Sequence, residues 1–362
     1  MVCLLNNVYD VEHRAYFMSE KKMELTPLKI RSHGASSVMQ YDERYTPYIE
    51  MTGLLPFVQL VSRSTPNLNV AAVTALIDRW RPETHSFHLR TGEMMVTLQD
   101  VSMITALPIE GKPLCMSTDS EGWRQQMEAL IGMSPQEPEV EDGGEKDRVP
   151  AGAPFTWIVA NFAHCPEYAD DEVIQRYACV YMWYVISRTI FADGTGKNAP
   201  WMWVKAFTVF DNKFSWGSAA LAYLYRQLDD ACRRTTKDGG VGGCMLLLSV
   251  EWEPYGVGPN FGDAHTFELN PLCVQERHLW LMRCPLICNW AVEFHLPHHV
   301  MRQFGYFQPH PPEWVDTDTQ LHRIGRSIIR AMSFCSSKVC TQLRAYDEPS
   351  TASILRLRSA TT

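Results

Sequence analysis

Cysteine and histidine, the side chains that most often bind zinc, gather between residues 284 and 310. The members of this group are Cys284, Cys288, His295, His298, His299 and His310. Cys284 and Cys288 have the short separation found in structural zinc sites. However, Pro285 lies between them and Pro297 lies among the histidines, so the side chains would have difficulty converging on one ion. The pattern favours buried cysteines and core or surface histidines, and we predict no metal ligand.

Two glycine-rich segments are candidates for a phosphate cradle. Residues 191–198 (FADGTGKN) resemble a P-loop, which needs glycine at the position of Phe191 and serine or threonine at that of Asn198. Residues 239–243 (GGVGG) lack both a preceding strand and the GxGxxG spacing of a dinucleotide-binding turn. We interpret the first segment as a turn after a helix and the second as a flexible helix entry. We therefore predict no cofactor-binding residue.

A nuclease or transposase would need separated carboxylates on a sheet, where they hold two metal ions. The candidate acids are Asp78, Asp100, Asp211, Asp316 and Asp318. None of them lies on a recognisable strand, so we interpret them as helix caps and surface acids. The sequence also has no GxSxG nucleophile motif and no papain-like cysteine context. We predict no catalytic residue, and a protein that is not an enzyme.

Basic and aromatic residues are interleaved from Arg277 to Arg344. Basic residues outnumber acids there, and the aromatic members are Phe304, Tyr306, Phe307 and Trp314. Such a surface can contact phosphates and stack on bases. Because no helix-turn-helix or zinc-finger pattern accompanies it, a solvated basic face or a surface for a protein partner is the favoured interpretation. Contact with nucleic acid is the alternative.

Hydrophobic periodicity indicates the elements that would position these residues. Apolar residues recur at helical spacing over residues 70–80, which predicts an amphipathic helix. Residues 86–89 and 94–97 flank a Thr-Gly-Glu turn and predict a small β-hairpin. Thr97 and Asp100 form a capping-box pattern, which predicts that a helix follows.

Helices are predicted along the rest of the chain, at about 170–191, 215–232, 241–252, 271–283, 285–295 and 316–333. Leu221, Leu224 and Leu228 have the spacing of one helix face, which supports the second of these. Strands and helices do not alternate as a parallel sheet would require. The predicted fold is mainly α: an irregular multi-helix globular domain with at most a small β-hairpin.

The composition is that of an intracellular protein. The 11 cysteines are scattered without a CxxC pair, which indicates reduced thiols in the cytosol or nucleus. Residues 1–10 have no basic segment ahead of their apolar residues, so we expect no signal peptide. The longest apolar run, 177–186, is far shorter than the roughly twenty residues needed to cross a bilayer. We interpret it as a buried core helix and expect no membrane partner.

Several segments together resemble the plant mobile domain family, also called the aminotransferase-like plant mobile domain or MAINTENANCE OF MERISTEMS-like family. They are GLLPF at 53–57, LIDRW at 76–80, the run THSFHLRTGEMMVTLQDVSMITALP at 84–108, SWGSAALA and LYRQL within 215–228, and WAVEFHLPHHVMRQFG at 290–305. Their order and spacing carry the resemblance from about residue 45 to 335.

The resemblance implies a plant protein from a group found both in transposable elements and as domesticated host genes. Host members are nuclear and support transposon silencing, genome stability and meristem maintenance. Some work beside, or are fused to, a type 7 serine/threonine phosphatase-like protein. The family has no established catalytic residues to carry over. Its name suggests pyridoxal phosphate, but no large α/β domain with a cofactor lysine is evident, so we expect no cofactor.

Acids, prolines and glycines are concentrated between residues 134 and 152, with almost nothing apolar to bury. This composition predicts a disordered insertion. The predicted organisation is an N-terminal extension (1–44), a first part of the plant mobile domain (45–133), the acidic insertion (134–152), a second part (153–347) and a tail (348–362).

The leading hypothesis is a non-enzymatic nuclear interaction module that acts through a protein partner, with a phosphatase-like protein as the candidate. One alternative is a transposon-derived accessory protein that contacts nucleic acid through its basic C-terminal region. A hydrolase or transferase with an unrecognised site is a minor third. The candidate interaction residues are Trp216, Arg226, Arg302 and Phe304. A structural role is nevertheless favoured for them, because Trp216 is near a helix start and Arg226 could pair with an acid on the adjacent turn.

Overall fold

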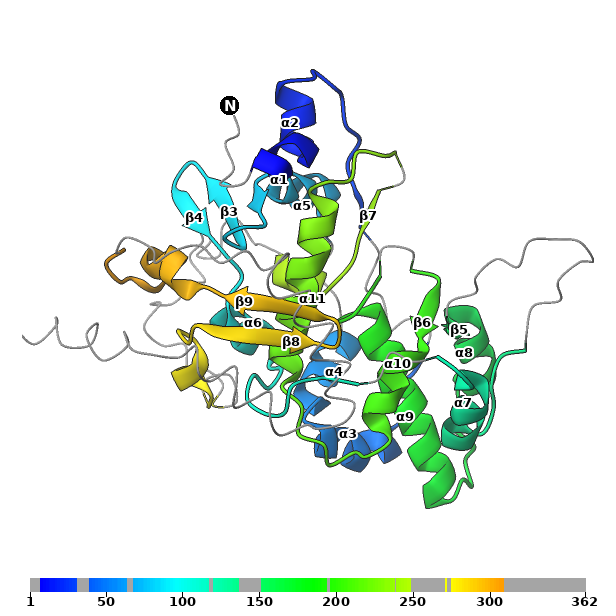
Figure 1. Ribbon diagram of the computed structural model, residues 1–362. Coiled ribbons are helices and arrows are strands. Elements are labelled where there is room, and N and C mark those ends of the chain that lie inside the picture. Colours follow the sequence, from blue (N-terminus) through cyan, green and yellow to red (C-terminus); the bar gives the residue numbers. More distant parts are fainter. Residues whose placement is uncertain are drawn as a thin grey trace, which may run out of the picture.

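Helix α11 (Trp216–Ala231) runs through the centre of the computed structural model, and the other elements surround it (Figure 1). The structure describes residues 7–30, 39–63, 68–116, 120–136, 151–193, 196–237, 239–248, 271 and 275–308. Most side chains of α11 are buried, and its bounds confirm the predicted helix 215–232. A Cβ at Gly217 would lie 2.7 Å from Cγ2 of Ile109, so the absence of a side chain at Gly217 lets the segment that contains Ile109 pack closely against α11.

The first half of the chain supplies a small antiparallel sheet and a capped helix beside α11. Helix α5 (Val70–Ile77) leads into β2 (Trp80–Arg81), which pairs with β3 (Ser86–Leu89). Strand β3 pairs in turn with β4 (Gly92–Met94), so the predicted hairpin is present. Helix α6 (Leu98–Thr105) begins with the predicted capping box, in which Thr97 and Asp100 bond each other's backbone N–H groups.

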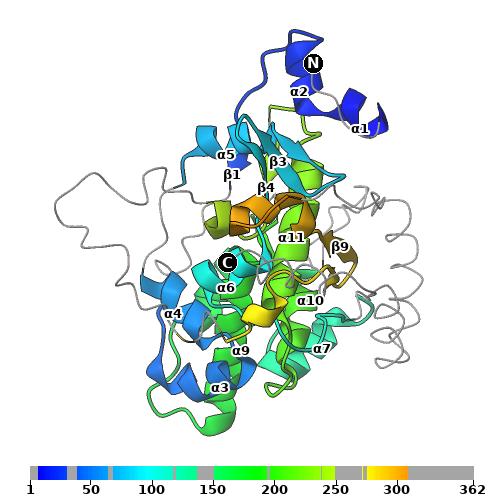
Figure 2. The same cartoon turned by 90° about the vertical axis from the view of Figure 1, so that its left-hand side faces the viewer.

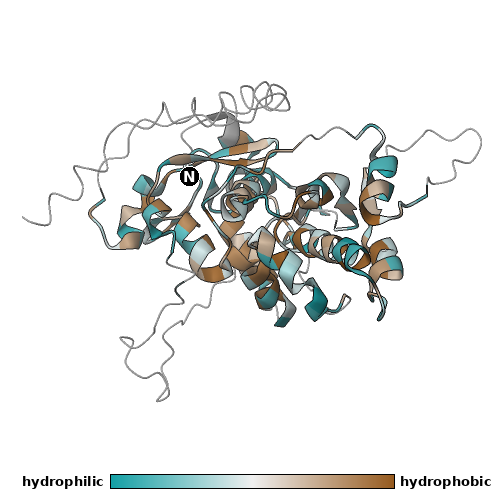
Figure 3. Ribbon diagram, turned by 90° about the horizontal axis from the view of Figure 1, so that it is seen from below, coloured by the Kyte–Doolittle hydropathy of each residue, from teal (hydrophilic) through white to brown (hydrophobic). Residues whose placement is uncertain are grey.

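Helix α9 (Asp171–Arg188) is the other long helix, and it confirms the predicted helix at 170–191. Asp170 caps it by accepting a 2.9 Å hydrogen bond from the backbone N–H of Val173. Side chains from Ala178 to Ser187 are all buried, as expected for a core helix. Shorter elements complete this part of the fold: α3 (Thr46–Thr52), α4 (Leu55–Arg63), α7 (Trp123–Ile131), α8 (Phe155–Phe162), α10 (Trp201–Val204), β5 (Gly152–Pro154) and β6 (Asn198–Pro200). Figure 3 shows that many of the helices carry both hydrophobic and hydrophilic residues, as expected for helices that are buried on one side.

The predicted helix 285–295 is wrong. These residues form a hairpin of β8 (Cys284–Cys288) and β9 (Ala291–His295), which lies across α11 (Figure 1). Asn289 and Trp290 make the two-residue turn, and Asn289 has a φ of 50°. Asparagine tolerates this left-handed conformation, which a tight hairpin turn needs. The mainly α prediction is still confirmed, since the strands of the described residues are short and form sheets of only two or three strands.

Two further helix predictions are largely wrong. Within 241–252 the chain forms β7 (Gly240–Val241) and the 3-10 turn η3 (Met245–Leu248). Within 271–283 the described residues contain the short 3-10 turn η4 (Arg277–Leu279). The first segment approaches the backbone of Ala192 closely at Gly242, and this tertiary context overrides a local helical pattern. Residues 249–252 and 272–274 of the two predictions lie outside the described residues.

The glycines at 239–243 permit close packing rather than helix entry. A Cβ at Gly242 would collide with the carbonyl of Ala192, and the backbone N–H of Gly243 donates to that same carbonyl oxygen at 2.7 Å. The start of the P-loop-like segment therefore packs against the backbone of residues 242–243. Of the segments predicted earlier, residues 137–150 of the acidic insertion and the helix at 316–333 lie outside the described residues.

The N-terminal segment packs onto the central part of the fold. Helices α1 (Asn7–Glu12) and α2 (Arg14–Ser19) lie at one end of the molecule, opposite α3 (Figures 1 and 2). Strand β1 (Lys29–Ile30) pairs in parallel with β7. Leu28 is buried in the hydrophobic core. The domain boundary after residue 44 stays a prediction, but this segment is part of the folded body.

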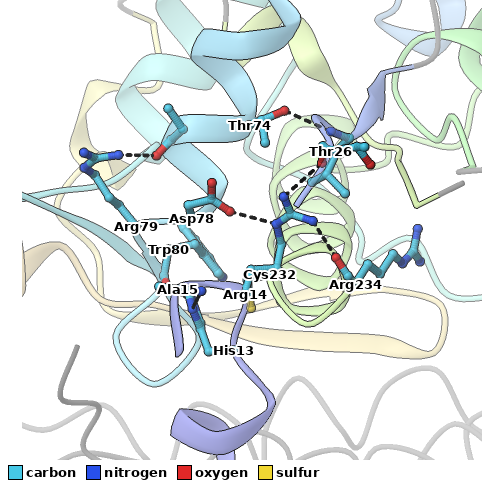
Figure 4. Close-up of polar contacts among 12 residues, drawn as sticks. His13, Arg14, Ala15, Thr26, Thr74, Asp78, Arg79, Trp80, Cys232 and Arg234 are labelled. Carbon is cyan, nitrogen blue, oxygen red and sulfur yellow. Dashed lines mark hydrogen bonds and ion pairs between the residues drawn. The ribbon is translucent and has the colours of Figure 1, made fainter. Parts of the chain in front are cut away.

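A buried arginine fixes this segment in place (Figure 4). The side chain of Arg14 is 2% exposed and donates from Nε to Oδ1 of Asp78 at 2.7 Å. Its Nη1 donates to the carbonyl of Arg234 at 2.6 Å and its Nη2 to that of Thr26 at 3.2 Å. All three nitrogens of the guanidinium are therefore used, which is what a buried charge requires.

His13 makes a second polar contact from the same segment. Its Nδ1 accepts from the backbone N–H of Ala15, so the proton lies on Nε2, which donates to the carbonyl of Trp80 at 3.0 Å. Burial, together with the charge of Arg81, lowers the pKa of His13 to about 4. The ring is therefore neutral near pH 7.

The described residues contain no helix that is both long enough and apolar enough to cross a membrane.

We expect Arg14→Ala to lower the free energy of unfolding by about 3 kcal/mol, because it leaves two part-buried carbonyls and Asp78 without their donor. Urea unfolding followed by tryptophan fluorescence measures this. The matched control is Arg79→Ala: Arg79 is exposed and bonds only the carbonyl of Ala75, so its loss should change stability by less than about 0.5 kcal/mol. Equal effects of the two substitutions would contradict this role of Arg14.

We expect His13→Asn to reduce the dependence of the free energy of unfolding on pH in the acid range. An asparagine oxygen can still cap α2, but it does not titrate. Since folding depresses the pKa of His13 from 6.5 to about 4, its contribution is complete above pH 6.5 and is lost as pH falls toward 4. The wild type should therefore lose about 2 to 3 kcal/mol more than the variant over this range. Parallel stability–pH curves from urea titrations would refute the assignment.

Candidate functional site

Three ionisable side chains from separate parts of the chain meet in the core beside α11. His85 lies in the turn between β2 and β3, Asp229 is in α11, and Glu293 is in β9. Among the described residues, these three side chains form the one group of histidine, cysteine or acid side chains that could share an ion. Their ligand atoms all lie within 4.8 Å of one another. We call them the buried charged cluster.

Each member of the buried charged cluster also has a partner outside it. Nδ1 of His85 donates to the carbonyl of Phe294 at 3.1 Å. Oδ1 of Asp229 accepts from the indole nitrogen of Trp80 at 2.7 Å. Oε1 of Glu293 lies 2.9 Å from Nη2 of Arg226 and accepts from its Nε at 3.1 Å. The remaining atoms, Nε2, Oδ2 and Oε2, face one another.

Aromatic rings enclose the imidazole of His85. The ring of Tyr225 is stacked on it, with centroids 4.7 Å apart and planes inclined by 24°. Trp80 lies near the same imidazole, with a centroid distance of 6.0 Å. The hydroxyl of Tyr225 donates to the carbonyl of Val96 at 2.5 Å, so its polar end is satisfied. His85 itself has a φ of 50°, an uncommon backbone conformation that the surrounding contacts maintain.

Burial and charge act in opposite directions in this cluster. Burial alone would lower the pKa of His85, but the close contact with Glu293, together with the charges of Asp229 and Glu293, outweighs it and raises that pKa. Burial raises the pKa of Asp229, although the charge of His85 opposes this. In the absence of a bound ion, His85 and the two carboxylates thus share one proton, which supplies one positive charge. Arg226 supplies the second positive charge.

The structure places two of the four sequence-predicted interaction residues in the interior. Trp216 is fully buried, and its indole nitrogen donates to the carbonyl of Thr52 at 3.0 Å. The side chain of Arg226 is 11% exposed and holds Glu293, an acid from β9 rather than from an adjacent helical turn. These two side chains therefore stabilise the fold instead of presenting a binding surface, in line with the structural role favoured for them.

Arg302 and Phe304 lie together in the 3-10 segment η5 (Pro297–Phe304). Arg302 is exposed, whereas Phe304 is half-buried against the core. The side-chain amide of Gln303 bonds both the backbone N–H and the carbonyl of Met95, which fixes η5 beside β4. The exposed aromatic residues Tyr306 (38%) and Phe307 (88%) follow. We call Arg302, Phe304, Tyr306 and Phe307 the η5 surface.

The cysteines and histidines considered for zinc do not form one site among the described residues. Cys284 and His295 are paired across the β8–β9 hairpin, but both nitrogens of His295 are already bonded, to Leu98 N–H and to the carbonyl of Met282. Cys288 is at the other end of that strand. His310 lies outside the described residues, and the described cysteines are all free thiols.

The acids considered for a nuclease are likewise separated. Asp78 pairs with Arg14, Asp100 caps α6, and Asp211 is an exposed partner of Lys213. Sequence reasoning instead missed His85, Asp229 and Glu293. A usable signal existed for Glu293, which interrupts the apolar stretch 291–294 (AVEF), since a buried charge must find a partner.

Comparison with known proteins identifies a matching family model and related plant proteins. A family model described as the plant mobile domain matches residues 56–250. In Arabidopsis thaliana, the serine/threonine-protein phosphatase 7 long form homolog is 28% identical over 321 residues, covering 72% of this chain and 23% of that protein. Protein MAIN-LIKE 2 is 34% identical over 205 residues (56% of this chain, 28% of the relative). Protein MAINTENANCE OF MERISTEMS is 35% identical over 187 residues (50% and 36%). No solved structure matches.

The chain thus spans between 23% and 36% of the length of these relatives. The family match begins in α4 and extends past η3, so it includes His85 and all of α11. It also covers more than half of the chain. The chain belongs to the plant mobile domain family.

Proposed function

We propose that this chain is a non-enzymatic nuclear interaction module that supports transposon silencing, genome stability and meristem maintenance through a phosphatase-like partner. The observation that carries the proposal is its match to the phosphatase 7 long form homolog, which involves 72% of this chain but 23% of that relative. In that relative, a segment like this chain therefore adjoins a much longer remainder. A separate chain of the same type can act beside a phosphatase-like protein instead of within it.

The arrangement of reactive groups supports a role without catalysis. His85 and Glu293 are 0% exposed and Asp229 is 3% exposed, so a substrate cannot reach the buried charged cluster. Burial raises the pKa of Cys179 and of Cys244 to about 12, which keeps both thiols protonated and unreactive. Catalytic groups, in contrast, usually line an accessible concave pocket.

The η5 surface has the composition of a protein contact. Aromatic and arginine side chains contribute most of the binding energy in many interfaces. Phe307 is 88% exposed, and Tyr306 and Arg302 lie close to it in the chain. Gln303 fixes the preceding turn to Met95, so the aromatic rings extend from a held segment. A surface that is already ordered loses less conformational entropy on binding.

The η5 surface also has side chains that suit the alternative function, which is contact with nucleic acid. Exposed aromatic rings beside arginine can also stack on bases of single-stranded nucleic acid. Much of the predicted basic region, 277–344, lies outside the described residues. Binding of nucleic acid by this surface would favour the transposon-derived accessory protein.

We expect the double substitution Tyr306→Ser and Phe307→Ser to reduce recovery of a type 7 phosphatase-like protein at least about tenfold in immunoprecipitates from plant nuclei. The wild-type chain should recover that protein. The matched control is Tyr168→Ser, because Tyr168 is 93% exposed but lies between α8 and α9. If the wild type recovers no phosphatase-like protein, the proposed partner is wrong. If all three proteins recover it equally, the η5 surface is not the contact.

We expect a fluorescently tagged chain to accumulate in nuclei of plant cells, and to show no salt-sensitive shift of single-stranded DNA or RNA at micromolar concentration. Uniform cytoplasmic fluorescence would contradict the nuclear role. A shift that weakens steeply with salt, and that is lost in the Tyr306→Ser and Phe307→Ser variant, would instead establish the nucleic-acid function.

A further inference from the structure

The buried charged cluster has the organisation of a metal centre. Each of its side chains uses one polar atom for a neighbouring group and directs the other inward. Phe294 holds His85, Trp80 holds Asp229, and Arg226 holds Glu293. Metal-binding histidines and carboxylates are typically oriented in this way by outer hydrogen bonds, which fix the tautomer and the direction of the ligand atom.

The inward-facing atoms surround a common position. Nε2 of His85 lies 3.2 Å from Oε2 of Glu293 and 3.8 Å from Oδ2 of Asp229. Despite the shorter distance, Nε2 of His85 makes no hydrogen bond of acceptable geometry with any described residue. A fully buried ring nitrogen that lies near two carboxylates without aligning to either is directed at a third location.

The separations also fit coordination of a small divalent cation. Zinc–nitrogen and zinc–oxygen bonds of about 2.0 to 2.1 Å place neighbouring ligands of a tetrahedral ion roughly 3.3 Å apart. The two measured separations from Nε2, 3.2 Å and 3.8 Å, lie near this value. All three ligand atoms are within 4.8 Å of one another, so a small contraction completes three corners of a tetrahedron.

We propose that His85, Asp229 and Glu293 form a zinc(II) site that ties together the β2–β3 turn, α11 and the β8–β9 hairpin. An imidazole nitrogen with two carboxylate oxygens is a donor set that zinc accepts. The site is enclosed, which suits a structural ion rather than a catalytic one. This inference is independent of the phosphatase-like partner and of the η5 surface.

Charge balance defines the competing arrangement. With a proton on His85, the charges of His85 and Arg226 offset those of Asp229 and Glu293. With zinc bound, His85 is neutral and Arg226 remains beside Glu293, which leaves one excess positive charge unless a bound water is deprotonated, as zinc promotes. The protonated cluster and the zinc-bound cluster therefore differ in metal content, which can be measured directly.

The test uses the full chain produced in zinc-supplemented medium, with metal content measured by mass spectrometry. We expect about one zinc per chain, and a thermal midpoint that falls on chelation and recovers when Zn²⁺ alone is added back. Asp229→Asn removes one donor at constant size and should weaken zinc binding roughly tenfold or more. Asp229→Cys restores a donor and should retain zinc. Cys284→Ser, in the other cysteine–histidine group, should leave the zinc content unchanged.

Cobalt substitution keeps the proposal falsifiable if Asp229→Asn does not fold. The Co²⁺-loaded wild type should absorb visible light as a four-coordinate ion. The Asp229→Cys protein should add a sulfur-to-cobalt charge-transfer band, which arises only if residue 229 is a ligand. Folded wild-type protein that contains no zinc and gains no thermal stability from added Zn²⁺ would overturn the proposal and leave a protonated ion-pair network. Zinc that is lost in Cys284→Ser would also overturn it.

Discussion

The central constraint on this fold is that α11 is buried along most of its length while carrying charged residues. Asp229 and Arg226 both come from this helix, and neither can reach bulk water without unfolding it. Each must therefore meet a partner supplied by another element. The β2–β3 turn supplies His85 and the β8–β9 hairpin supplies Glu293. The β2–β3 turn and the β8–β9 hairpin of this mainly helical protein therefore supply the charged partners that the buried residues of α11 need.

Much of the helical framework was predictable because its signals are local. A continuous apolar run indicated α9, periodic leucines indicated α11, and the Thr97–Asp100 capping box indicated α6. The β8–β9 hairpin was missed because its apolar residues form a continuous run, which does not distinguish a helix from a buried strand. Asn289, which suits a hairpin turn, and Pro285, which disfavours a helix interior, were the local evidence against a helix. A helical pattern there was outweighed by packing on α11.

The buried charged cluster could not be inferred from spacing, because its members come from distant parts of the chain. Trp80 and Asp229, for example, are hydrogen-bonded although they are 149 residues apart. Family resemblance identified the segments that contain most of these residues, but it could not say which side chains face the core. Trp216 illustrates the point: it stands in a recognisable segment but is fully buried, whereas Tyr306 and Phe307 of the η5 surface are exposed.

The N-terminal segment has a consequence for biosynthesis. Arg14 binds the carbonyl of Arg234, a partner 220 residues further along the chain. At about 5 to 20 residues per second, the ribosome delivers that partner roughly 10 to 40 s after Arg14 has been made. During this interval the first helices emerge with an unpaired guanidinium and uncovered apolar residues. The contacts that fix the segment around Arg14 are therefore completed only after residue 234 has been synthesised.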